Sequence, residues 1–249
     1  LDTADLRGGI WLDANINDGD GDMSRFGFSI PNPAINVLVN SDRVGGNAWP
    51  LGEILVVEID DPSTTQVNPD FETTTTTDVA DWNPIETWFE IGLNGYDLKT
   101  GDLVTLTGGG FSKQLTIQTL AITEVNLDTD TVYGIAEPNQ EVEVVTCYSI
   151  CINQNTIADQ DGNWSSSFDP NVDDSANIRG DSWVAVVVHD VDGDTTRFGY
   201  GIPNPTFGVR ANDDRVEGWQ WPLGATVDVE IDDPSTPENP DFNDSTTVI

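Results

Sequence analysis

Residues 178–238 read IRGDSWVAVVVHDVDGDTTRFGYGIPNPTFGVRANDDRVEGWQWPLGATVDVEIDDPSTPE, and residues 6–66 read LRGGIWLDANINDGDGDMSRFGFSIPNPAINVLVNSDRVGGNAWPLGEILVVEIDDPSTTQ. The two stretches are related by a constant offset of 172 residues, and 32 of the 61 aligned positions are identical. Self-similarity at a fixed period is typical of repeat architectures. The repeat therefore decides how the remainder of the chain is divided.

A fainter repeat lies inside the 172-residue unit. Val44-x-Gly46-x-x-x-Pro50 is followed by alternating apolar residues, and Val132-x-Gly134-x-x-x-Pro138 is followed by the same pattern. We therefore interpret the unit as two related modules, joined at residues 30–33 and near residues 126–130. The Pro-Asn-Pro sequence at 31–33 has two fixed φ angles, which predicts a stiff spacer.

These repeats predict four segments. Residues 1–33 are expected to be the second half of a module, and residues 34–126 and 127–205 a complete module each. Residues 206–249 are expected to be the first half of a further module, completed by continuing chain or by a neighbouring molecule. The sequence has no initiator Met and no signal peptide, which suggests a mature or excised piece of a longer protein.

Period-two alternation of apolar residues predicts an all-β fold. The expected strands cover residues 54–59, 103–107, 115–125, 141–145, 182–188 and 226–231. Clusters of Gly, Asn, Asp and Pro separate them, and we find no convincing helical period. Short strands in modules of this size favour tandem immunoglobulin-like β-sandwich modules in an elongated array.

The composition is strongly acidic, and this limits the partners. The chain has 44 Asp and Glu residues against 9 Lys and Arg residues, for a formal net charge of −35. Such a surface repels nucleic acids and anionic lipid headgroups. No apolar stretch is long enough to span a membrane as a helix. Divalent cations, above all Ca²⁺, are the partners that this charge favours.

Two short acidic turns are the sharpest candidate sites. Carboxylates at alternate positions of a tight turn converge on one point, and Ca²⁺ prefers six to eight oxygen ligands. The predicted structural calcium ligands are Asp18, Asp20 and Asp22, with Asp190, Asp192 and Asp194 in the second copy. Weaker candidates are Asp159, Asp161, Asp60, Asp61, Asp232 and Asp233. The alternative is an Asp-rich hairpin turn that needs no metal.

Covalent modification is expected at several positions. Cys147 and Cys151 are separated by three residues in a strand-turn-strand pattern, which favours a disulfide over a zinc site. Asn163 and Asn243 each begin an N-glycosylation acceptor pattern. The low-complexity run Thr73, Thr74, Thr75, Thr76 and Thr77 is either an exposed loop or a candidate O-glycan site.

No residue is a candidate for catalysis, and we expect the protein not to be an enzyme. His189 is the only histidine, and its counterpart in the repeat is Asn17. One copy therefore lacks the base that a Ser-His-Asp or Cys-His arrangement needs. The many acids allow a glycosidase-type pair of carboxylates, but nothing in the sequence singles one out.

Arginine and tryptophan also follow the repeat. Six repeated arginines are interpreted as structural clamps, with ligand binding as the alternative: Arg7, Arg25, Arg43, Arg179, Arg197 and Arg215. The pairs Trp11/Trp183 and Trp49/Trp221 are expected in cores or joints. Trp82, Trp88 and Trp219 have no aromatic counterpart and are the candidates for stacking on carbohydrate.

Residues 132–138 (VYGIAEP), 142–144 (VEV) and 158–164 (ADQDGNW) resemble the bacterial Ig-like (Big-type) tandem repeat domains of secreted adhesins and surface proteins. The sequence departs from that family at Asn139, where the family usually has Gly. The other module, with WPLG at 49–52, resembles its partner in very long repeat proteins predicted on filamentous bacteria. The resemblance implies a secreted, elongated and non-enzymatic protein.

Together these patterns predict an extracellular structural protein of the bacterial cell surface. We expect it to be the repeat unit of a fibre or filament stiffened by calcium, with copies of itself as end-to-end partners. The alternative is a calcium-dependent adhesin or a carbohydrate-binding surface protein, with glycans as partners. A surface hydrolase is the more distant alternative.

Overall fold

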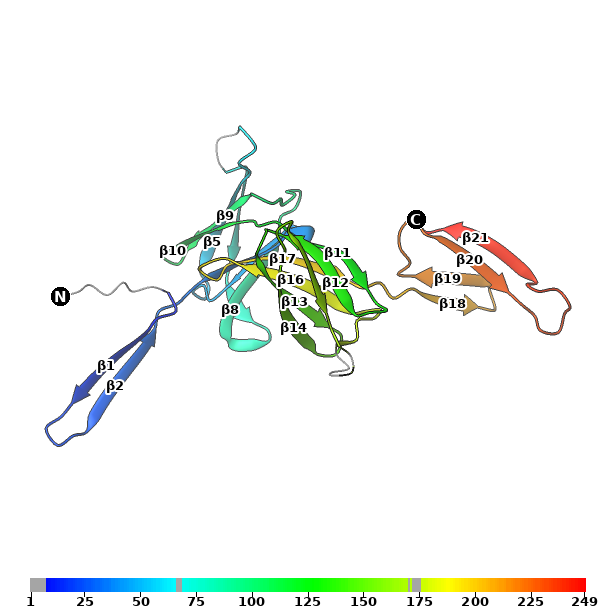
Figure 1. Cartoon of the computed structure of the whole chain (residues 1–249). Helices are drawn as coiled ribbons and strands as arrows, with labels where there is room; N and C mark the ends of the chain where they lie inside the picture. Colours follow the sequence, from blue (N-terminus) through cyan, green and yellow to red (C-terminus); the bar gives the residue numbers. More distant parts are fainter. Residues whose placement is uncertain (1–7, 66–68, 170, 172–175) are drawn as a thin grey trace.

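The computed structural model describes residues 8–65, 69–169, 171 and 176–249. Over these residues the regular secondary structure is β-strand, apart from short 3₁₀ turns such as η1 (Val39–Ser41), so the all-β prediction is confirmed. The described residues include no helix that is long and apolar enough to cross a membrane. Two central modules carry hairpins that project from them (Figure 1).

The first module is built from two sheets that enclose one core. Its strands are β3 (Ala34–Leu38), β4 (Arg43–Asn47), β5 (Ile54–Asp60), β6 (Phe71–Thr76), β7 (Asp78–Ala80), β8 (Asn83–Gly92), β9 (Leu103–Gly108) and β10 (Phe111–Thr116). One sheet has the order β10-β9-β5-β6, and β3-β4-β8-β7 belong to the other. Leu55, Val57 and Ile59 alternate with less buried residues along β5 and are fully buried, as period-two patterning predicts.

The second module repeats this plan. Its strands are β11 (Leu120–Asn126), β12 (Thr131–Ala136), β13 (Glu141–Cys147), β14 (Cys151–Ile157), β15 (Asn163–Ser167), β16 (Trp183–His189) and β17 (Thr195–Gly201). The sheet β11-β12-β15 lies opposite β14-β13-β16-β17. Buried Val and Ile side chains from both sheets, together with Trp164, form its core.

Both modules have the same strand order when β7 is set aside. The first, second and fifth strands of each module pair in one sheet, and the fourth, third, sixth and seventh pair in the other. The two modules share one continuous eight-stranded sheet, because β17 of the second pairs in parallel with β3 of the first. This parallel pairing brings the acidic loop that precedes β17 next to the first module.

The structure corrects two expectations about the region between the modules. The expected strand at 115–125 is two strands, because β10 ends at Thr116 and β11 begins at Leu120. The first core ends at Ile117, and the second begins at Leu120. The modules therefore divide near residues 118–119, earlier than the expected boundary between residues 126 and 127.

The projecting hairpins repeat the backbone of the central modules. At the N-terminal end β1 (Trp11–Asn17) pairs with β2 (Met23–Ser29), in the register of β16 with β17. At the C-terminal end β18 (Thr206–Arg210) pairs with β19 (Arg215–Trp219), and β20 (Thr226–Ile231) pairs with β21 (Phe242–Thr247). Asp42 and its counterpart Asp214 have φ angles of 50° and 48°, so even the strained turn recurs.

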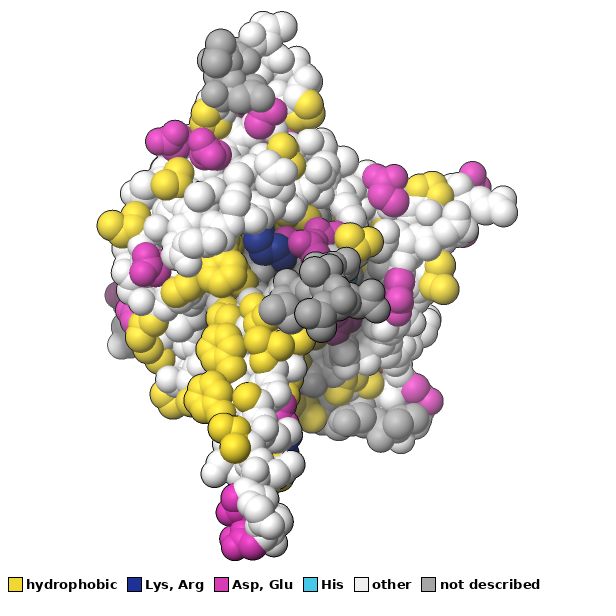
Figure 2. Space-filling view, turned by 90° about the vertical axis from the view of Figure 1, so that its left-hand side faces the viewer, with side chains coloured by type: hydrophobic (Ala, Val, Ile, Leu, Met, Phe, Trp, Pro, Cys, Tyr) yellow, Lys and Arg dark blue, Asp and Glu magenta, His cyan; other side chains and the backbone are white. Residues whose placement is uncertain are grey.

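The hairpins expose the side chains that their counterparts bury. Ile16 is 74% exposed whereas Val188 is 1% exposed, and Phe207 is 70% exposed whereas Ile35 is 0% exposed. Figure 2 shows a band of hydrophobic side chains running down to an acidic tip on the face turned to the viewer. Each hairpin therefore presents an exposed apolar face. In the central modules a second sheet covers the corresponding face.

Candidate cation-binding loops and the joint between the modules

Three acidic loops adopt the same type of hairpin turn. Asp18 Oδ1 accepts hydrogen bonds from the backbone N–H groups of Asp20, Gly21 and Asp22 at 3.3, 3.1 and 2.9 Å. Local side-chain-to-backbone bonds of this kind are why Asp favours turns. The first carboxylate of the loop therefore has a structural role whether or not a metal is bound.

The other two loops use their first Asp in the same way. Asp190 Oδ1 accepts from the N–H groups of Asp192 and Asp194 at 3.1 and 2.9 Å. Asp159 Oδ1 accepts from the N–H groups of Asp161 and Asn163, each at 2.9 Å. The Asp-rich hairpin turn, which is the alternative to a metal site, is thus present in all three loops.

Two of the loops also bring three carboxylates together. In each of the groups Asp18/Asp20/Asp22 and Asp190/Asp192/Asp194, one oxygen from each residue lies within 4.8 Å of the others. The first group is exposed throughout, but Asp194 in the second has no exposed surface. Within the described residues no such group includes Asp159 or Asp161.

The second acidic loop already contacts a cation from the protein. Lys113 on β10 places its Nζ 2.9 Å from Asp194 Oδ1 and 3.1 Å from Asp192 Oδ2. Burial by itself would lower the pKa of Lys113, but the hydrogen bonds to both aspartates outweigh it and leave the pKa raised. Burial raises the pKa of Asp194. The ammonium group of the first module thus offsets part of the negative charge of the acidic loop of the second.

Further side-chain bonds join the two modules beside the β17–β3 pairing. Asp194 Oδ1 also accepts the backbone N–H of Ile35 at 2.7 Å. The Asn40 side chain donates to the Gly199 carbonyl at 2.6 Å and accepts from the Gly199 N–H at 3.0 Å. Thr195 Oγ1 donates to Asn36 Oδ1 at 2.8 Å. We call this set of contacts, together with Lys113, the module joint.

The paired aspartates at the end of β5 serve a different loop. Asp61 accepts hydrogen bonds at Oδ1 from the Ser63 N–H (2.8 Å) and Oγ (2.6 Å), and Lys99 Nζ lies 2.9 Å from Asp61 Oδ2. These groups lower the pKa of Asp61 to about 2. Asp70 Oδ2 accepts from the Asp61 N–H at 2.8 Å.

The corresponding loop after β20 repeats these bonds without the lysine. The Ser235 N–H and Oγ donate to Asp233 Oδ1 at 2.9 and 2.7 Å, and the Asp233 N–H donates to Asp241 Oδ2 at 2.6 Å. Neither Asp60/Asp61 nor Asp232/Asp233 belongs to a three-carboxylate group in the described part of the chain. Asp61 and Asp233 therefore act in these loops as turn-forming residues.

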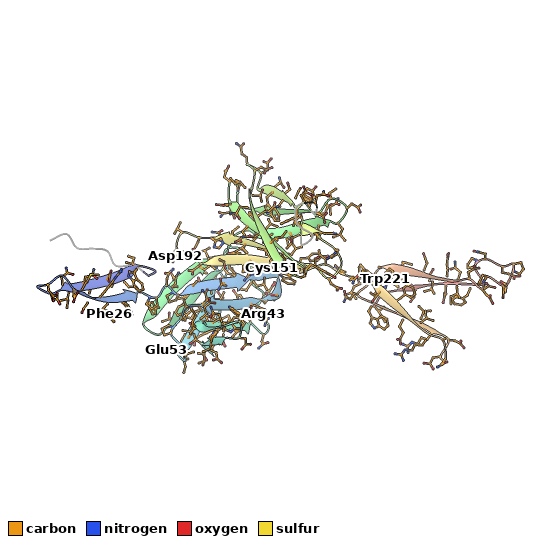
Figure 3. All side chains as sticks on the ribbon, turned by 90° about the horizontal axis from the view of Figure 1, so that it is seen from below. Phe26, Arg43, Glu53, Cys151, Asp192 and Trp221 are labelled. Carbon is orange, nitrogen blue, oxygen red and sulfur yellow. A yellow bond between two sulfur atoms is a disulfide. The ribbon has the colours of Figure 1, made fainter. Side chains whose placement is uncertain are left out.

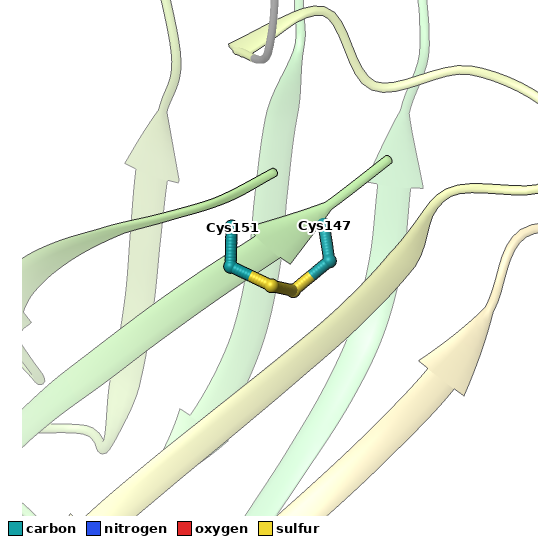
Figure 4. Close-up of a disulfide and its surroundings, with 2 residues drawn as sticks. All are labelled: Cys147 and Cys151. Carbon is teal, nitrogen blue, oxygen red and sulfur yellow. A yellow bond between two sulfur atoms is a disulfide. The ribbon is translucent and has the colours of Figure 1, made fainter. Parts of the chain in front are cut away.

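Cys147 and Cys151 form a disulfide, with Cα atoms 4.1 Å apart, across the end of the β13–β14 hairpin (Figure 4).

Among the candidate modification sites, Asn163 and Asn243 are exposed on β15 and β21. Thr74 and Thr76 are exposed, and Thr73 and Thr75 are partly buried. Thr77 is 2% exposed and donates to the Pro50 carbonyl at 2.5 Å, so its expected role as an O-glycan site is wrong.

The remaining candidates lie on the surface of the modules. Trp82 is 63% exposed at the β7–β8 hairpin and meets Trp88 edge to face, with ring centroids 4.7 Å apart. Trp219 is half exposed on β19. His189 is exposed, with Nε2 3.3 Å from Glu143 Oε2.

Most of the repeated arginines that the structure describes pair with nearby groups, as the clamp interpretation expects. Arg25 pairs with Asp13, Arg43 with Glu90 and Arg215 with Glu217, while the Arg179 guanidinium lies 3.9 Å from the centre of the Tyr148 ring. Arg197 lines a hollow with Arg43 and Glu90. Arg7 lies outside the described residues.

The Pro-Asn-Pro spacers also have a packed side chain. Asn204 donates to Asp181 Oδ2 at 2.6 Å, and a Cβ on Gly180 would meet Asn204 at 2.7 Å. A Cβ on Gly8 would meet Asn32 Oδ1 at 2.5 Å in the same way. The repeated glycine is thus explained by the close approach of the spacer asparagine.

No protein-family model matches the chain, and no curated protein matches it. Among solved structures the chain is similar to a tetra-tandem repeat from the extending region of a large adhesion protein. The identity is 14%, over 80% of this chain and 58% of the other, with a TM-score of 0.26. The chain thus spans little more than half of that structure.

A second similar structure comes from work on host cell surface retention of a 1.5-MDa bacterial ice-binding adhesin. The identity is again 14%, over 77% of this chain and 73% of the other, with a TM-score of 0.23. TM-scores of this size do not establish a common fold.

Proposed function

We propose that the chain is a segment of an extended, non-enzymatic array of immunoglobulin-like β-modules on the surface of a bacterium. The strand order supports the immunoglobulin-like assignment: each module pairs its first, second and fifth strands in one sheet. Relative to a constant-type immunoglobulin domain, the fourth strand pairs in the opposite sheet. The 172-residue repeat is the step of the proposed array.

The observation that carries this proposal is the module joint. Paired strands and buried polar bonds connect the two modules of a unit, where a flexible chain would allow free movement. Relative domain motion is the default unless an interface is large and hydrophobic, and here the shared sheet and the buried Lys113–Asp194 pair oppose it. A joint of this kind suits a protein whose task is to hold a shape, and the strong negative charge keeps neighbouring arrays apart.

Immunogold electron microscopy tests the proposed location and form. Antibodies raised against this chain should label fibres or a surface layer on intact cells of the source bacterium. Labelling that requires permeabilised cells, or labelled particles without any extended form, would overturn the proposal. Cells that lack the coding sequence are the control for antibody specificity.

Calcium binding belongs to the proposal as the stiffening element. The exposed group Asp18/Asp20/Asp22 offers three carboxylates within 4.8 Å, and this close negative charge favours a divalent cation. At Asp190/Asp192/Asp194 the Lys113 ammonium contacts two of the three carboxylates. We therefore expect Ca²⁺ to bind at the first group more tightly than at the second.

Calorimetric titration of metal-free protein with CaCl₂ tests this ranking. Asp20→Asn removes one carboxylate while Asp18 keeps its turn-forming bonds, so it should abolish the tighter binding event. Asp161→Asn, in a loop with the same turn but two carboxylates, is the matched control and should change nothing. An unaltered titration of Asp20→Asn, or identical melting curves in EDTA and calcium, would remove calcium from the proposal.

Carbohydrate binding is the second candidate function, and the exposed Trp82, packed against the partly buried Trp88, is the observation in its favour. Aromatic rings at a hairpin tip offer a stacking surface for sugars. Binding on a glycan array that Trp82→Ala abolishes and Trp219→Ala leaves intact would support an adhesin. Absence of binding to any glycan would leave the array without this second function.

A further inference from the structure

The two ends of the molecule carry the two sides of the module joint. β2 is the counterpart of β17, and β18 is the counterpart of β3, each at an offset of 172 residues. Inside the chain β17 and β3 pair in parallel, with Thr195, Thr196 and Arg197 opposite Asn36, Val37 and Leu38. In the described structure the outer edges of β2 and β18 have no partner strand. Phe26 on β2 and Trp221 beyond β19 mark these opposite ends (Figure 3).

Two polar contacts of the joint are retained at these two edges, whereas Met23 and Gly208 replace Thr195 and Asn36. Asn212 on the β18–β19 turn is the counterpart of Asn40, and Gly27 on β2 is the counterpart of Gly199. Asp22, the counterpart of Asp194, ends the exposed acidic loop next to β2. The N–H that would meet it belongs to Phe207, at the position of Ile35. The two halves of these retained contacts are therefore present on one chain, but at opposite ends.

We infer that the N-terminal hairpin of one chain docks on β18 of a second copy and rebuilds the module joint between molecules. Strand addition to an exposed sheet edge is a recurrent recognition mode. Superposing the registers places Met23, Ser24 and Arg25 opposite Gly208, Val209 and Arg210. The Asn212 side chain then bonds to the Gly27 backbone, and the Asp22 carboxylate accepts the Phe207 N–H. This inference rests on the proposed array and specifies its contact between copies.

The charges at this contact are compatible with docking. Arg25 and Arg210 would lie opposite each other, but each already has an acidic partner, Asp13 and Glu217 respectively. The surfaces that meet differ, since one is β2 and the other β18, so the contact is heterologous and does not close on itself. A net charge of −35 on each copy opposes association over long distances. Salt at about 1 M, where the Debye length is about 3 Å, removes this opposition.

Disulfide trapping between separate chains tests the register. The only two cysteines are joined to each other, so introduced thiols report on the contact alone. Ser24→Cys on one chain and Val209→Cys on another would face the same side of adjacent strands. Neighbouring strands lie about 4.8 Å apart, within the range that a disulfide spans. Mixed in 1 M salt under mild oxidation, the two variants should give a heterodimer.

The controls separate docking from random collision. Met23→Cys points to the opposite face and should cross-link to Val209→Cys at least tenfold more slowly. Asn212→Ala, added to the Val209→Cys chain, should slow trapping at least tenfold, whereas Asn155→Ala should not. The intramolecular pair Thr196→Cys/Val37→Cys is the positive control. It should form a disulfide within one chain, because Thr196 and Val37 lie opposite each other in the native joint.

Three results would overturn the inference. Homodimers that form as fast as the heterodimer, or equal rates for Met23→Cys and Ser24→Cys, would exclude this register. Failure of every pair of variants to cross-link would exclude docking between separate copies. If immunogold labelling still marks surface fibres in that case, the proposed array stands and only its contact is wrong.

Discussion

The ammonium group of Lys113 lies 2.9 Å from Oδ1 of Asp194, a carboxylate with no exposed surface. The side chain of Lys113 is itself only 11% exposed, so the two charges meet away from water, between two modules. Removing one partner of a buried pair leaves the other charge uncompensated. The stability of the second acidic loop therefore depends on a residue of the first module.

Lys113→Met should lower the free energy of unfolding by about 3 kcal/mol, because Asp194 then keeps a buried charge with one partner fewer. Urea denaturation followed by tryptophan fluorescence measures this. Arg43→Met is the control, since the side chains of Arg43 and its partner Glu90 are 48% and 34% exposed. A loss for Arg43→Met as large as that for Lys113→Met would contradict the buried pair.

Acidification should destabilise the first module through Asp61. Its folded pKa of about 2 lies below the ordinary value of 3.8, so the folded state holds its proton less tightly than the unfolded state. The stabilisation is therefore complete above about pH 4 and is lost as the pH falls toward 2. Ser63→Ala removes the shortest hydrogen bond to this carboxylate and brings its folded pKa closer to the unfolded value, so the variant should be less stable at pH 7 and lose less stability on acidification. Superimposable urea midpoints between pH 2 and 5 for the variant and the wild type would contradict this account.

Gly134→Ala should destabilise the second module by about 3 kcal/mol. A Cβ at this position would lie 2.1 Å from a ring carbon of Trp164 and 2.2 Å from the Ala121 carbonyl oxygen, and overpacked cores cost this much. Gly92→Ala, on β8, is the matched control because nothing lies within 4 Å of the added carbon. Thermal unfolding of both variants should show a lower midpoint for Gly134→Ala alone.

Loss of the disulfide should be tolerated. The sequence separation of Cys147 and Cys151 is 4, so the bond constrains a short loop in the unfolded chain and contributes about 2 kcal/mol at most. The double variant Cys147→Ser/Cys151→Ser should remain folded, with a modest shift in its urea midpoint. Loss of the far-ultraviolet β-sheet spectrum in the variant would show that the bond is required for folding.

Much of the fold could be predicted from local patterns. Alternating apolar residues located β5, β9, β13 and β20, because a half-buried strand exposes every second side chain. Asn139 stands where the resembled family usually has Gly. Its φ of 63° is a conformation that Gly adopts freely and that Asn tolerates better than most residues. The strand break at residues 118–119 was missed because Gln118 and Thr119 carry no turn signal as strong as Gly or Pro.

The module joint could be predicted only in part. Asn40 and Asn212 are identical across the repeat, which was a usable signal for a shared contact. Lys113 lies between the repeated stretches, and only the parallel pairing of β17 with β3 brings it to the acidic loop. Contacts of this kind depend on the arrangement of sheets and not on sequence spacing. The same sequence signal, three alternate aspartates, therefore marks an exposed loop in one copy and a buried ion pair in the other.

The parallel pairing of β17 with β3 also decides how the protein carries a pulling load. The chain enters the two-module unit at the start of β3 and leaves it at the end of β17, and these two strands are neighbours. Tension along the chain therefore pulls opposite ends of a parallel pair and loads its hydrogen bonds in shear, all at once. The load passes from β3 to β17 without crossing either core, so the modules stay folded until this short clamp ruptures.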